Sequence, residues 1–286
     1  MFIYFEFMQE STFETMEPSP VSAADPALTV EQAIANLQGS DLGLRFYAAW
    51  WLGRFRVRED AAILALIAAL EDEADQTEAG GYPLRRNAAR ALGKLGDLRA
   101  VPVLIRSLAC SDYYVREAAA QALLALGDPA CVPMLIDLLA TGVQGDQLVP
   151  NQPDLSQPYD AILEAVGALR ATHAIPYAKP FLEHPVERVQ YAAIRAMYQL
   201  THDSLYGDQL VQALDSPSLQ LRRTILADLG AISYLPAAEA IAQTQAENSL
   251  KLIALKGLLE AQLQQTSPPD LTAGAIKVMT LMDDLL

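Results

Sequence analysis

The chain has few cysteines, few aromatic residues and no long uninterrupted hydrophobic run. Its two cysteines, Cys110 and Cys131, are too few in 286 residues for a disulfide framework, so we expect small buried or half-buried thiols. No apolar stretch reaches the roughly 18 residues that cross a bilayer. The apolar segment Met1 to Met8 is short and has no basic leader. We therefore expect a soluble, cytoplasmic protein without a membrane span.

Basic residues are also scarce. The chain has 20 Lys and Arg against 35 Asp and Glu, a net charge of −15. This surplus repels phosphate backbones, and the arginines are spread along the chain instead of forming one basic stripe. The composition therefore predicts no nucleic-acid partner.

The signatures of self-contained catalysis are missing too. The sequence has no dinucleotide-binding fingerprint, no phosphate-binding loop and no Gly-x-Ser-x-Gly motif. His173, His184 and His202 lie in different segments without metal-ligand spacing. We therefore predict no metal and no cofactor, and the sequence identifies no catalytic residue.

What the chain does contain is one helical signature, repeated seven times. A leading basic or polar residue is followed at plus three, plus six and plus seven by small, small and large apolar residues, which share one helical stripe. The leading residues are Arg45, Arg85, Arg116, Tyr159, Gln190, Arg222 and Lys251. They are separated by 40, 31, 43, 31, 32 and 29 residues. A period of about 31 residues is typical of a solenoid, so we predict an all-α solenoid of stacked helix pairs.

Turn residues divide each repeat into helix, turn and helix. Asp97 and Asp128 precede short apolar runs and are expected N-caps, with proline early in the second helix where it is tolerated. Gly96 and Gly127 stand where the first helix should end. These positions place the turns inside the repeats.

The leading arginines are expected to be structural. Asp41 and Asp112 lie four residues before Arg45 and Arg116, a spacing that brings opposite charges together on a helix. We therefore predict that each arginine pairs with the aspartate that precedes it.

The ends of the chain and two insertions depart from the repeat. Residues 1–27 are apolar, then acidic and proline-rich, which predicts an arm without a core of its own before a solenoid over residues 28–286. Insertions at 71–83 and 141–158 enter at the same junction between repeats, so both should project from one edge. Such loops often carry function, although a mobile linker is the alternative. An amphipathic helix over Leu271 to Leu286 is expected to cap the last repeat.

Two tryptophans stand out when the copies are aligned. Six copies hold residues suited to a solvated face at plus five, including Arg90 and Arg195, but the first copy holds Trp50. Leaving this side chain exposed costs about 2 kcal/mol, so we expect a partner chain or the N-terminal arm to cover it. Trp51 at plus six suits core packing. Both are candidates for a partner interface.

Aromatic and basic residues gather near the start of two adjacent repeats. Tyr82 and Tyr113 occupy equivalent positions, with Tyr114, Arg85 and Arg86 close by. Neighbouring helices pack about 8 to 10 Å apart, so these side chains are expected to line one patch. The patch would suit a flat conjugated ligand that carries carboxylates. The alternative is that the tyrosines only decorate turns.

Two segments resemble a known family. The Trp-Trp pair within Leu44 to Arg54 and the Gly-Gly-Tyr-Pro motif within Glu78 to Gly93 resemble the alpha (E-type) subunits of heterodimeric phycocyanobilin lyases. These subunits are built from HEAT-like (armadillo-type) repeats. The similarity runs from about Leu28 to the C-terminus and leaves residues 1–27 outside.

The resemblance implies a chaperone-like lyase that acts with a related beta (F-type) subunit. Such an enzyme joins phycocyanobilin, an open-chain tetrapyrrole, through a thioether to a cysteine of the phycocyanin alpha subunit, in the biogenesis of the phycobilisome, the cyanobacterial antenna complex. Since the acceptor supplies the thiol, the lyase need only hold and orient the bilin. Asp75 and Glu78 are candidates to pair with a protonated bilin nitrogen, and Arg85 and Arg86 with its propionates. The alternative function is a non-catalytic HEAT-repeat adaptor in phycobilisome assembly or turnover.

Overall fold

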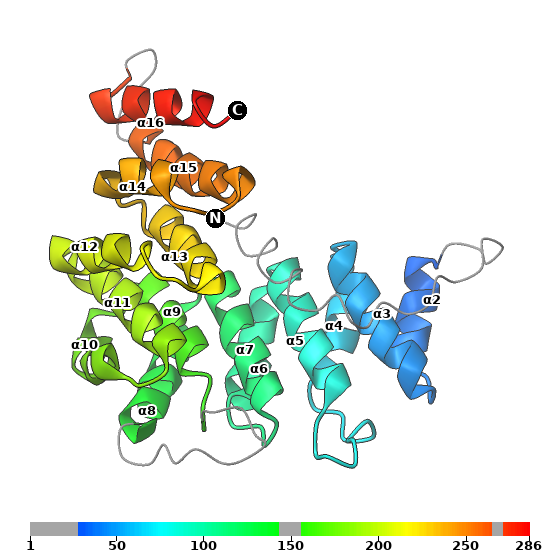
Figure 1. Cartoon of the computed structure of the whole chain (residues 1–286). Helices are drawn as coiled ribbons and strands as arrows, with labels where there is room; N and C mark the ends of the chain where they lie inside the picture. Colours follow the sequence, from blue (N-terminus) through cyan, green and yellow to red (C-terminus); the bar gives the residue numbers. More distant parts are fainter. Residues whose placement is uncertain (1–27, 143–155, 265–270) are drawn as a thin grey trace. The chain divides into compact units, whose positions relative to one another are not determined.

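A computed structural model of the chain describes residues 28–142, 156–264 and 271–286. All regular elements of these residues are helical (Figure 1). After α2 (Val30–Leu37), longer first helices alternate with second helices. The first helices are α3 (Leu42–Arg54), α5 (Pro83–Leu95), α7 (Tyr113–Leu126), α9 (Tyr159–Ala168), α11 (Glu187–Thr201), α13 (Leu219–Ile232) and α15 (Asn248–Leu263). The second helices are α4 (Asp60–Ala69), α6 (Val101–Ser107), α8 (Val132–Gly142), α10 (Ile175–Ala178), α12 (Ser204–Ala213), α14 (Ala238–Gln243) and α16 (Ala273–Asp283).

The seven leading residues of the signature fall in the seven first helices. Short 3-10 turns precede several second helices, namely η1 (Leu98–Ala100), η2 (Pro129–Cys131), η3 (Thr172–Ala174) and η5 (Leu235–Ala237), and η4 (Lys179–Glu183) follows α10. The all-α solenoid of helix pairs predicted from the period is confirmed in the described part of the chain.

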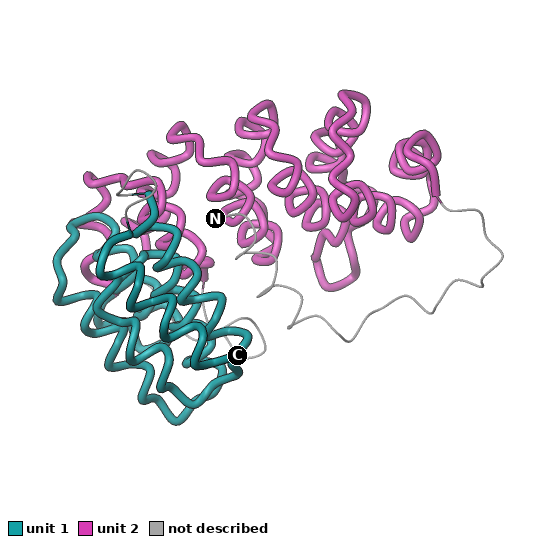
Figure 2. The backbone as a smooth tube through the Cα atoms, turned by 90° about the horizontal axis from the view of Figure 1, so that it is seen from above, with its two compact units in different colours: residues 1–20, 182–286 teal, residues 21–181 magenta. Residues whose placement is uncertain are grey.

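The chain divides into two compact units (Figure 2). The N-terminal unit spans residues 21–181, and the C-terminal unit contains residues 182–286. In the first, the small and large apolar residues of the signature, such as Ala88 and Leu92, are fully buried. The same positions of the second, such as Ala254 and Leu258, belong to its own core. Each unit therefore buries the predicted stripe.

The helix caps predicted from the turn residues are confirmed. Asp97 and Asp128 each accept a hydrogen bond from the backbone N–H two residues later, at 2.9 and 2.8 Å. Gly96 and Gly127 end α5 and α7 with φ of 76° and 70°. Residues with a Cβ rarely adopt this left-handed conformation, so the glycines stop the helices here.

Adjacent first helices of the N-terminal unit approach each other through glycine. A Cβ at Gly53 in α3 would lie 2.8 Å from the Cα of Ala91 in α5, and a Cβ at Gly93 would lie 2.9 Å from the Cα of Ala122 in α7. Both glycines are eight residues after the leading residue of their repeat, and both alanines are six after theirs. The close stacking of α3, α5 and α7 therefore depends on this repeated Gly–Ala contact.

Gly93→Val is expected to lower the free energy of unfolding by about 2 to 3 kcal/mol, because the new methyl groups collide with backbone that cannot move alone. Urea unfolding followed by circular dichroism measures this change. Gly43→Ala in the first turn of α3 is the control, since a Cβ there meets only the side chain of Asp41, at 3.3 Å. Equal stability of the two variants would contradict the role of the Gly–Ala contact.

The leading residues latch the junction that precedes each first helix. Arg45 donates to the Leu37 carbonyl, Gln190 to Leu182 and Lys251 to Ala242. The other donations from leading residues to carbonyls are Arg85 to Asp72, Arg116 to Cys110, Ser111 and Ser156, and Arg222 to Ser216 and Gln245. Tyr159 shares a hydroxyl contact of 3.1 Å with Ser156. These bonds satisfy carbonyls that a helix end or turn leaves open.

The predicted pairing of Arg45 and Arg116 with the preceding aspartates is wrong. Asp41 and Asp112 instead accept backbone N–H groups as the N-caps of α3 and α7. A carboxylate at an N-cap satisfies a backbone donor that has no other partner, which explains the choice. The arginines are structural, as predicted, but through other partners.

The plus-five position is a solvated face in some copies only, since Trp50 and Lys256 are exposed whereas Arg90 and Arg195 are not. Arg195 at this position in α11 donates to Asp228 in α13 at 2.7 Å, and its side chain is only 14% exposed. Arg90 in α5 is half-buried. In α11 the position therefore faces the next first helix, α13, and the charges of Arg90 and Arg195 are partly desolvated.

The remaining regions are described in part. Residues 1–27, the predicted arm, lie outside the described residues, as do 143–155 of the second insertion. The first insertion is described throughout. Helix α16 falls inside the segment predicted to cap the last repeat. Cys131 is buried and Cys110 half-buried, both as free thiols, which confirms that prediction.

Candidate functional site

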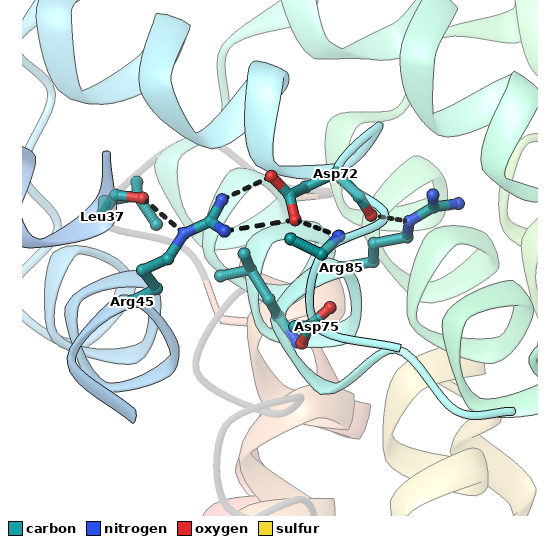
Figure 3. A network of polar contacts seen from close by, with 7 residues as sticks. Leu37, Arg45, Asp72, Asp75 and Arg85 are labelled. Atoms are coloured by element: carbon teal, nitrogen blue, oxygen red, sulfur yellow. Dashed lines mark hydrogen bonds and ion pairs between the residues drawn. The ribbon is translucent and has the colours of Figure 1, made fainter. Parts of the chain in front are cut away.

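The insertion at 71–83 is fastened to the repeats by an arginine network (Figure 3). Arg45 donates through both terminal nitrogens to the carboxylate of Asp72, at 3.2 and 2.6 Å, and through Nε to the Leu37 carbonyl. Arg85 donates through Nε to the backbone carbonyl of Asp72 at 2.6 Å. One residue at the start of the insertion is thus held from α3 and from α5. Its carboxylate accepts charged hydrogen bonds from Arg45, which lower the pKa of Asp72.

Asp75 caps helix α5 from within the insertion. Its Oδ2 accepts the N–H of Leu84 at 2.6 Å, a role that the N-cap residue Tyr82 leaves to it. The side chain is 7% exposed, and burial raises the pKa of Asp75. The insertion therefore packs against the N-terminus of α5, with the Asp75 side chain pointing inward.

The raised pKa of Asp75 predicts how stability changes with pH. An acid whose pKa is higher in the folded than in the unfolded protein loses stabilisation as pH rises from about 4 through the folded pKa. Asp75→Asn keeps an acceptor oxygen but does not ionise, so it should gain stability relative to the wild type between about pH 4 and pH 7. Urea unfolding at the two pH values measures this. Asp75→Ala, which also does not ionise but lacks the acceptor, should be about 1 kcal/mol less stable than Asp75→Asn at both pH values. A pH-independent difference between wild type and Asp75→Asn would contradict the prediction.

Tyr82 and Arg85 stack at the end of the insertion. The guanidinium carbon of Arg85 lies 4.1 Å from the centroid of the Tyr82 ring, a cation–π contact. The N–H of Tyr82 donates to Oδ2 of Asp112 at 2.7 Å, and the other oxygen of that carboxylate accepts the N–H of Tyr114. One aspartate therefore ties the insertion to the first turn of α7 in the next repeat.

Arg86 and the tyrosine pair meet between α5 and α7. The guanidinium carbon of Arg86 lies 5.8 Å from the centroid of the Tyr114 ring, whose partner Tyr113 packs edge to face against it at 5.5 Å. The guanidinium carbon of Arg116 lies 5.7 Å from the centroid of the Tyr113 ring. The structure thus brings Arg86, Tyr113 and Tyr114 together, as the spacing predicted.

The candidate residues differ in what they present to a ligand. Asp75 and Tyr113 are buried, and Arg85 is occupied by Tyr82 and Asp72. Tyr114 is 45% exposed, Glu78 is exposed, and Tyr82 and Arg86 are half-buried. Sequence reasoning missed Asp72, although the acidic start of the insertion was a signal that a carboxylate could reach the leading arginines.

The two tryptophans lie on α3 in the same unit. Trp50 is 47% exposed among the described residues and packs against Tyr47, with ring centroids 5.5 Å apart. Trp51 is half-buried, and its ring centroid lies 4.8 Å from that of Phe55. Phe46, one turn before Trp50, is also exposed. The role of Trp50 and Trp51 at a partner interface stays a prediction.

The described residues contain no group of three or more His, Cys, Asp or Glu that could hold a metal ion. In the same part of the chain, no helix combines the length and the apolar character that a membrane span requires. The candidate residues of the insertion, α5 and α7 therefore offer a ligand aromatic, cationic and acidic side chains.

Comparison with known proteins places the chain in a family. Residues 44–72 match the PBS lyase HEAT-like repeat, and residues 79–146 match HEAT repeats. The phycocyanobilin lyase subunit alpha of Microchaete diplosiphon is 69% identical over 267 residues, which cover 92% of this chain and 91% of that protein. The chain belongs to the phycocyanobilin lyase alpha-subunit family. The E-type resemblance, the HEAT-like fold class and the prediction of a bilin lyase enzyme are thereby confirmed.

More distant members and a solved structure agree with this assignment. The bilin biosynthesis protein PecE of Nostoc sp. PCC 7120 is 44% identical over 245 residues, covering 85% of this chain and 91% of that protein. A solved structure of the complex of CpcE and CpcF of phycocyanin lyase from Nostoc sp. PCC 7120 contains a chain that is 62% identical. The match covers 95% of this lyase subunit and 100% of that chain, with a TM-score of 0.85.

Proposed function

We propose that this subunit pairs with a related beta (F-type) subunit and attaches phycocyanobilin to a cysteine of the phycocyanin alpha subunit. The observation that carries the proposal is the 62% identical, structurally similar chain in the complex of CpcE and CpcF of phycocyanin lyase. The exposed aromatic face of α3 around Trp50 offers a surface for such a partner. We also propose that the protein is soluble and acts in the cytoplasm.

The reaction requires no nucleophile from this chain. The thiol of the acceptor cysteine adds across the ethylidene double bond of ring A, so that a C–S bond forms and the thiol proton ends on the bilin. No electrons are gained or lost overall. Holding the bilin and the thiol in position lowers the barrier by removing the entropic cost of their encounter. The proposed role of this subunit is therefore to bind and orient the bilin, which is its substrate and no cofactor.

The site residues divide into two proposed roles. Asp75 and Arg85 hold the insertion and α5 in place through Leu84 and Asp72. Tyr82, Arg86 and Tyr114 form the accessible part, and Glu78 is the exposed carboxylate nearest to it in sequence. Tyrosine rings suit the flat pyrroles, and guanidinium groups suit the propionates.

Reconstitution tests the proposal against the adaptor alternative. The chain is co-produced with an F-type subunit, the phycocyanin alpha subunit and phycocyanobilin, and the acceptor is examined under denaturing conditions for covalent colour. The lyase proposal expects a coloured acceptor only when this chain is present. A colourless acceptor, with the chain still bound to phycobilisome components, would favour the non-catalytic adaptor.

A further inference from the structure

The carboxylate of Asp112 joins two backbone segments that belong to adjacent repeats. Its Oδ2 accepts the N–H of Tyr82, at the end of the insertion, at 2.7 Å. Its Oδ1 accepts the N–H of Tyr114, in the first turn of α7, at 2.8 Å. Hydrogen bonds to a charged acceptor are stronger than those between neutral groups. One side chain therefore holds the backbone of both tyrosines in the accessible part of the proposed bilin surface.

The α7 side of this contact is held independently of the insertion. Asp112 is the N-cap of α7, and its carbonyl accepts the N–H of Arg116 at 3.2 Å. The Arg116 guanidinium donates to the carbonyls of Cys110 and Ser111, directly before Asp112, at 2.7 and 3.0 Å. The carboxylate thus has a fixed place at the start of α7, and the insertion is the segment that the bond to Tyr82 restrains.

The insertion side has little stiffness of its own, because two glycines precede Tyr82. Gly80 has a φ of 82°, and the N–H of Gly81 donates to Oγ1 of Thr77 at 2.9 Å. A Cβ at Gly81 would lie 3.5 Å from Oδ2 of Asp112, so the turn runs directly beside the carboxylate. Glycine loses more conformational freedom on ordering than any other residue. The segment before Tyr82 therefore depends on such bonds for its position.

We propose that Asp112 is a positioning residue of the lyase, which fixes Tyr82 relative to Tyr114 so that the two rings hold the bilin in the orientation for thiol addition. The inference rests on the proposed bilin lyase function and gives Asp112 no contact with the bilin or the thiol. An open-chain tetrapyrrole has rotatable bonds between its rings, so fixed aromatic groups reduce the number of bound orientations. Loss of the restraint should lower the rate of transfer from the bound state more than the affinity.

Two variants separate the bond to Tyr82 from the cap of α7. Asp112→Ser keeps a good N-cap for Tyr114, but its short hydroxyl cannot also accept the N–H of Tyr82. Asp112→Asn keeps a capping oxygen and turns an NH₂ donor toward that N–H. The matched control is Asp128→Ser, because Asp128 also caps by accepting the N–H two residues later, at 2.8 Å, and stands at the start of η2.

The test uses the purified complex of this chain with an F-type subunit. Absorbance titration gives the dissociation constant of phycocyanobilin, and the rate of covalent transfer to the phycocyanin alpha subunit is measured at saturating bilin. Both Asp112 variants should lower this rate at least about fivefold and change the dissociation constant by less than about threefold. Asp128→Ser should transfer at the wild-type rate, and its urea midpoint should match that of Asp112→Ser.

A double-mutant cycle shows whether Asp112 acts through Tyr82. Tyr82→Leu removes the ring, so adding Asp112→Ser to it should change the transfer rate by less than about 1.5-fold. A further large loss in the Tyr82→Leu background would overturn the inference, because Asp112 would then have another role.

Three other results would also overturn the inference. They are wild-type transfer by a folded Asp112→Ser protein, an equal loss in Asp128→Ser, and loss of the folded state in both Asp112 variants, which would make Asp112 a residue of stability alone. Failure of the wild-type complex to transfer any bilin would instead overturn the proposed function.

Discussion

Replacing Asp228 by alanine is expected to lower the free energy of unfolding by about 3 to 5 kcal/mol. Asp228 occupies the plus-six position of α13, where most copies hold a small residue, and is 3% exposed. Burial raises the pKa of Asp228, and the Arg195 guanidinium, 2.7 Å away, opposes that rise. Without the carboxylate, the buried charge of Arg195 loses this ion pair, and breaking a buried ion pair by removing one partner is costly.

Urea unfolding of the full chain, followed by circular dichroism at 222 nm, measures the loss. The matched variant replaces both partners, Asp228→Leu with Arg195→Met, because removing the pair as a unit leaves neither charge behind. Its stability should be within about 1 to 2 kcal/mol of the wild type. A double variant as unstable as Asp228→Ala would show that the loss comes from packing and not from the broken ion pair.

Replacing Arg45 by alanine is expected to have the second largest effect, about 3 kcal/mol of stability. The side chain is only 11% exposed, and its guanidinium holds the Asp72 carboxylate and the Leu37 carbonyl at the same time (Figure 3). Its removal leaves the neighbouring carboxylates of Asp72 and Asp75 without the nearest cation, so the pKa of Asp72 should rise. The insertion then loses its attachment to α3, while Arg85 still holds it to α5.

The Arg45 variant also links the insertion to the proposed function. If the insertion positions the bilin surface, covalent transfer by Arg45→Ala should fall at least about tenfold at a temperature where circular dichroism shows a folded chain. Covalent transfer by Arg45→Lys should lie between that of the wild type and that of Arg45→Ala, since an ammonium group cannot reproduce the bidentate contact with the Asp72 carboxylate. Full transfer by a folded Arg45→Ala protein would separate the insertion from the function.

The lowered pKa of Asp72 predicts how the stabilisation by the Arg45–Asp72 contact depends on pH. A carboxylate whose pKa is lowered on folding contributes stability above its unfolded pKa of about 4, and that stability is lost as pH falls through the lower folded value. The wild-type advantage over Asp72→Asn should therefore be full at pH 7 and shrink below pH 4. Unfolding in urea over this range measures it, and a constant advantage would mean that the charge of Asp72 is not what stabilises the insertion.

Elements that depend on neighbouring residues could be predicted from the sequence. Gly96 and Gly127 end helices because their left-handed conformation is a local requirement, and Asp97 and Asp128 cap because the donor lies two residues away. The cluster of Arg86 with Tyr114 could be predicted as well, because both stand at the start of adjacent repeats. What these residues bind stays a prediction.

Partners between repeats could not be predicted in the same way. Both Asp41 and Asp72 are acids that Arg45 could pair with, and the sequence favoured Asp41 because it is nearer along the chain. The N-cap of α3 takes the Asp41 carboxylate, which leaves Asp72, 27 residues from Arg45, as its partner. A helical pattern gives the face of a residue on its own helix but not what the next helix places opposite, which is why Arg195 was expected in solvent.

Sequence patterns alone were enough to predict that this chain is a series of helix pairs, where each pair turns and which family it resembles. Those properties follow from short-range periodicity and from motifs that are continuous in the chain. Packing between the helices decided that the leading residues latch the preceding junctions and that Asp75 faces inward to cap α5. These depend on the distance and rotation between packed helices, and the competition of several carboxylates for one guanidinium is resolved only once the helices are in contact.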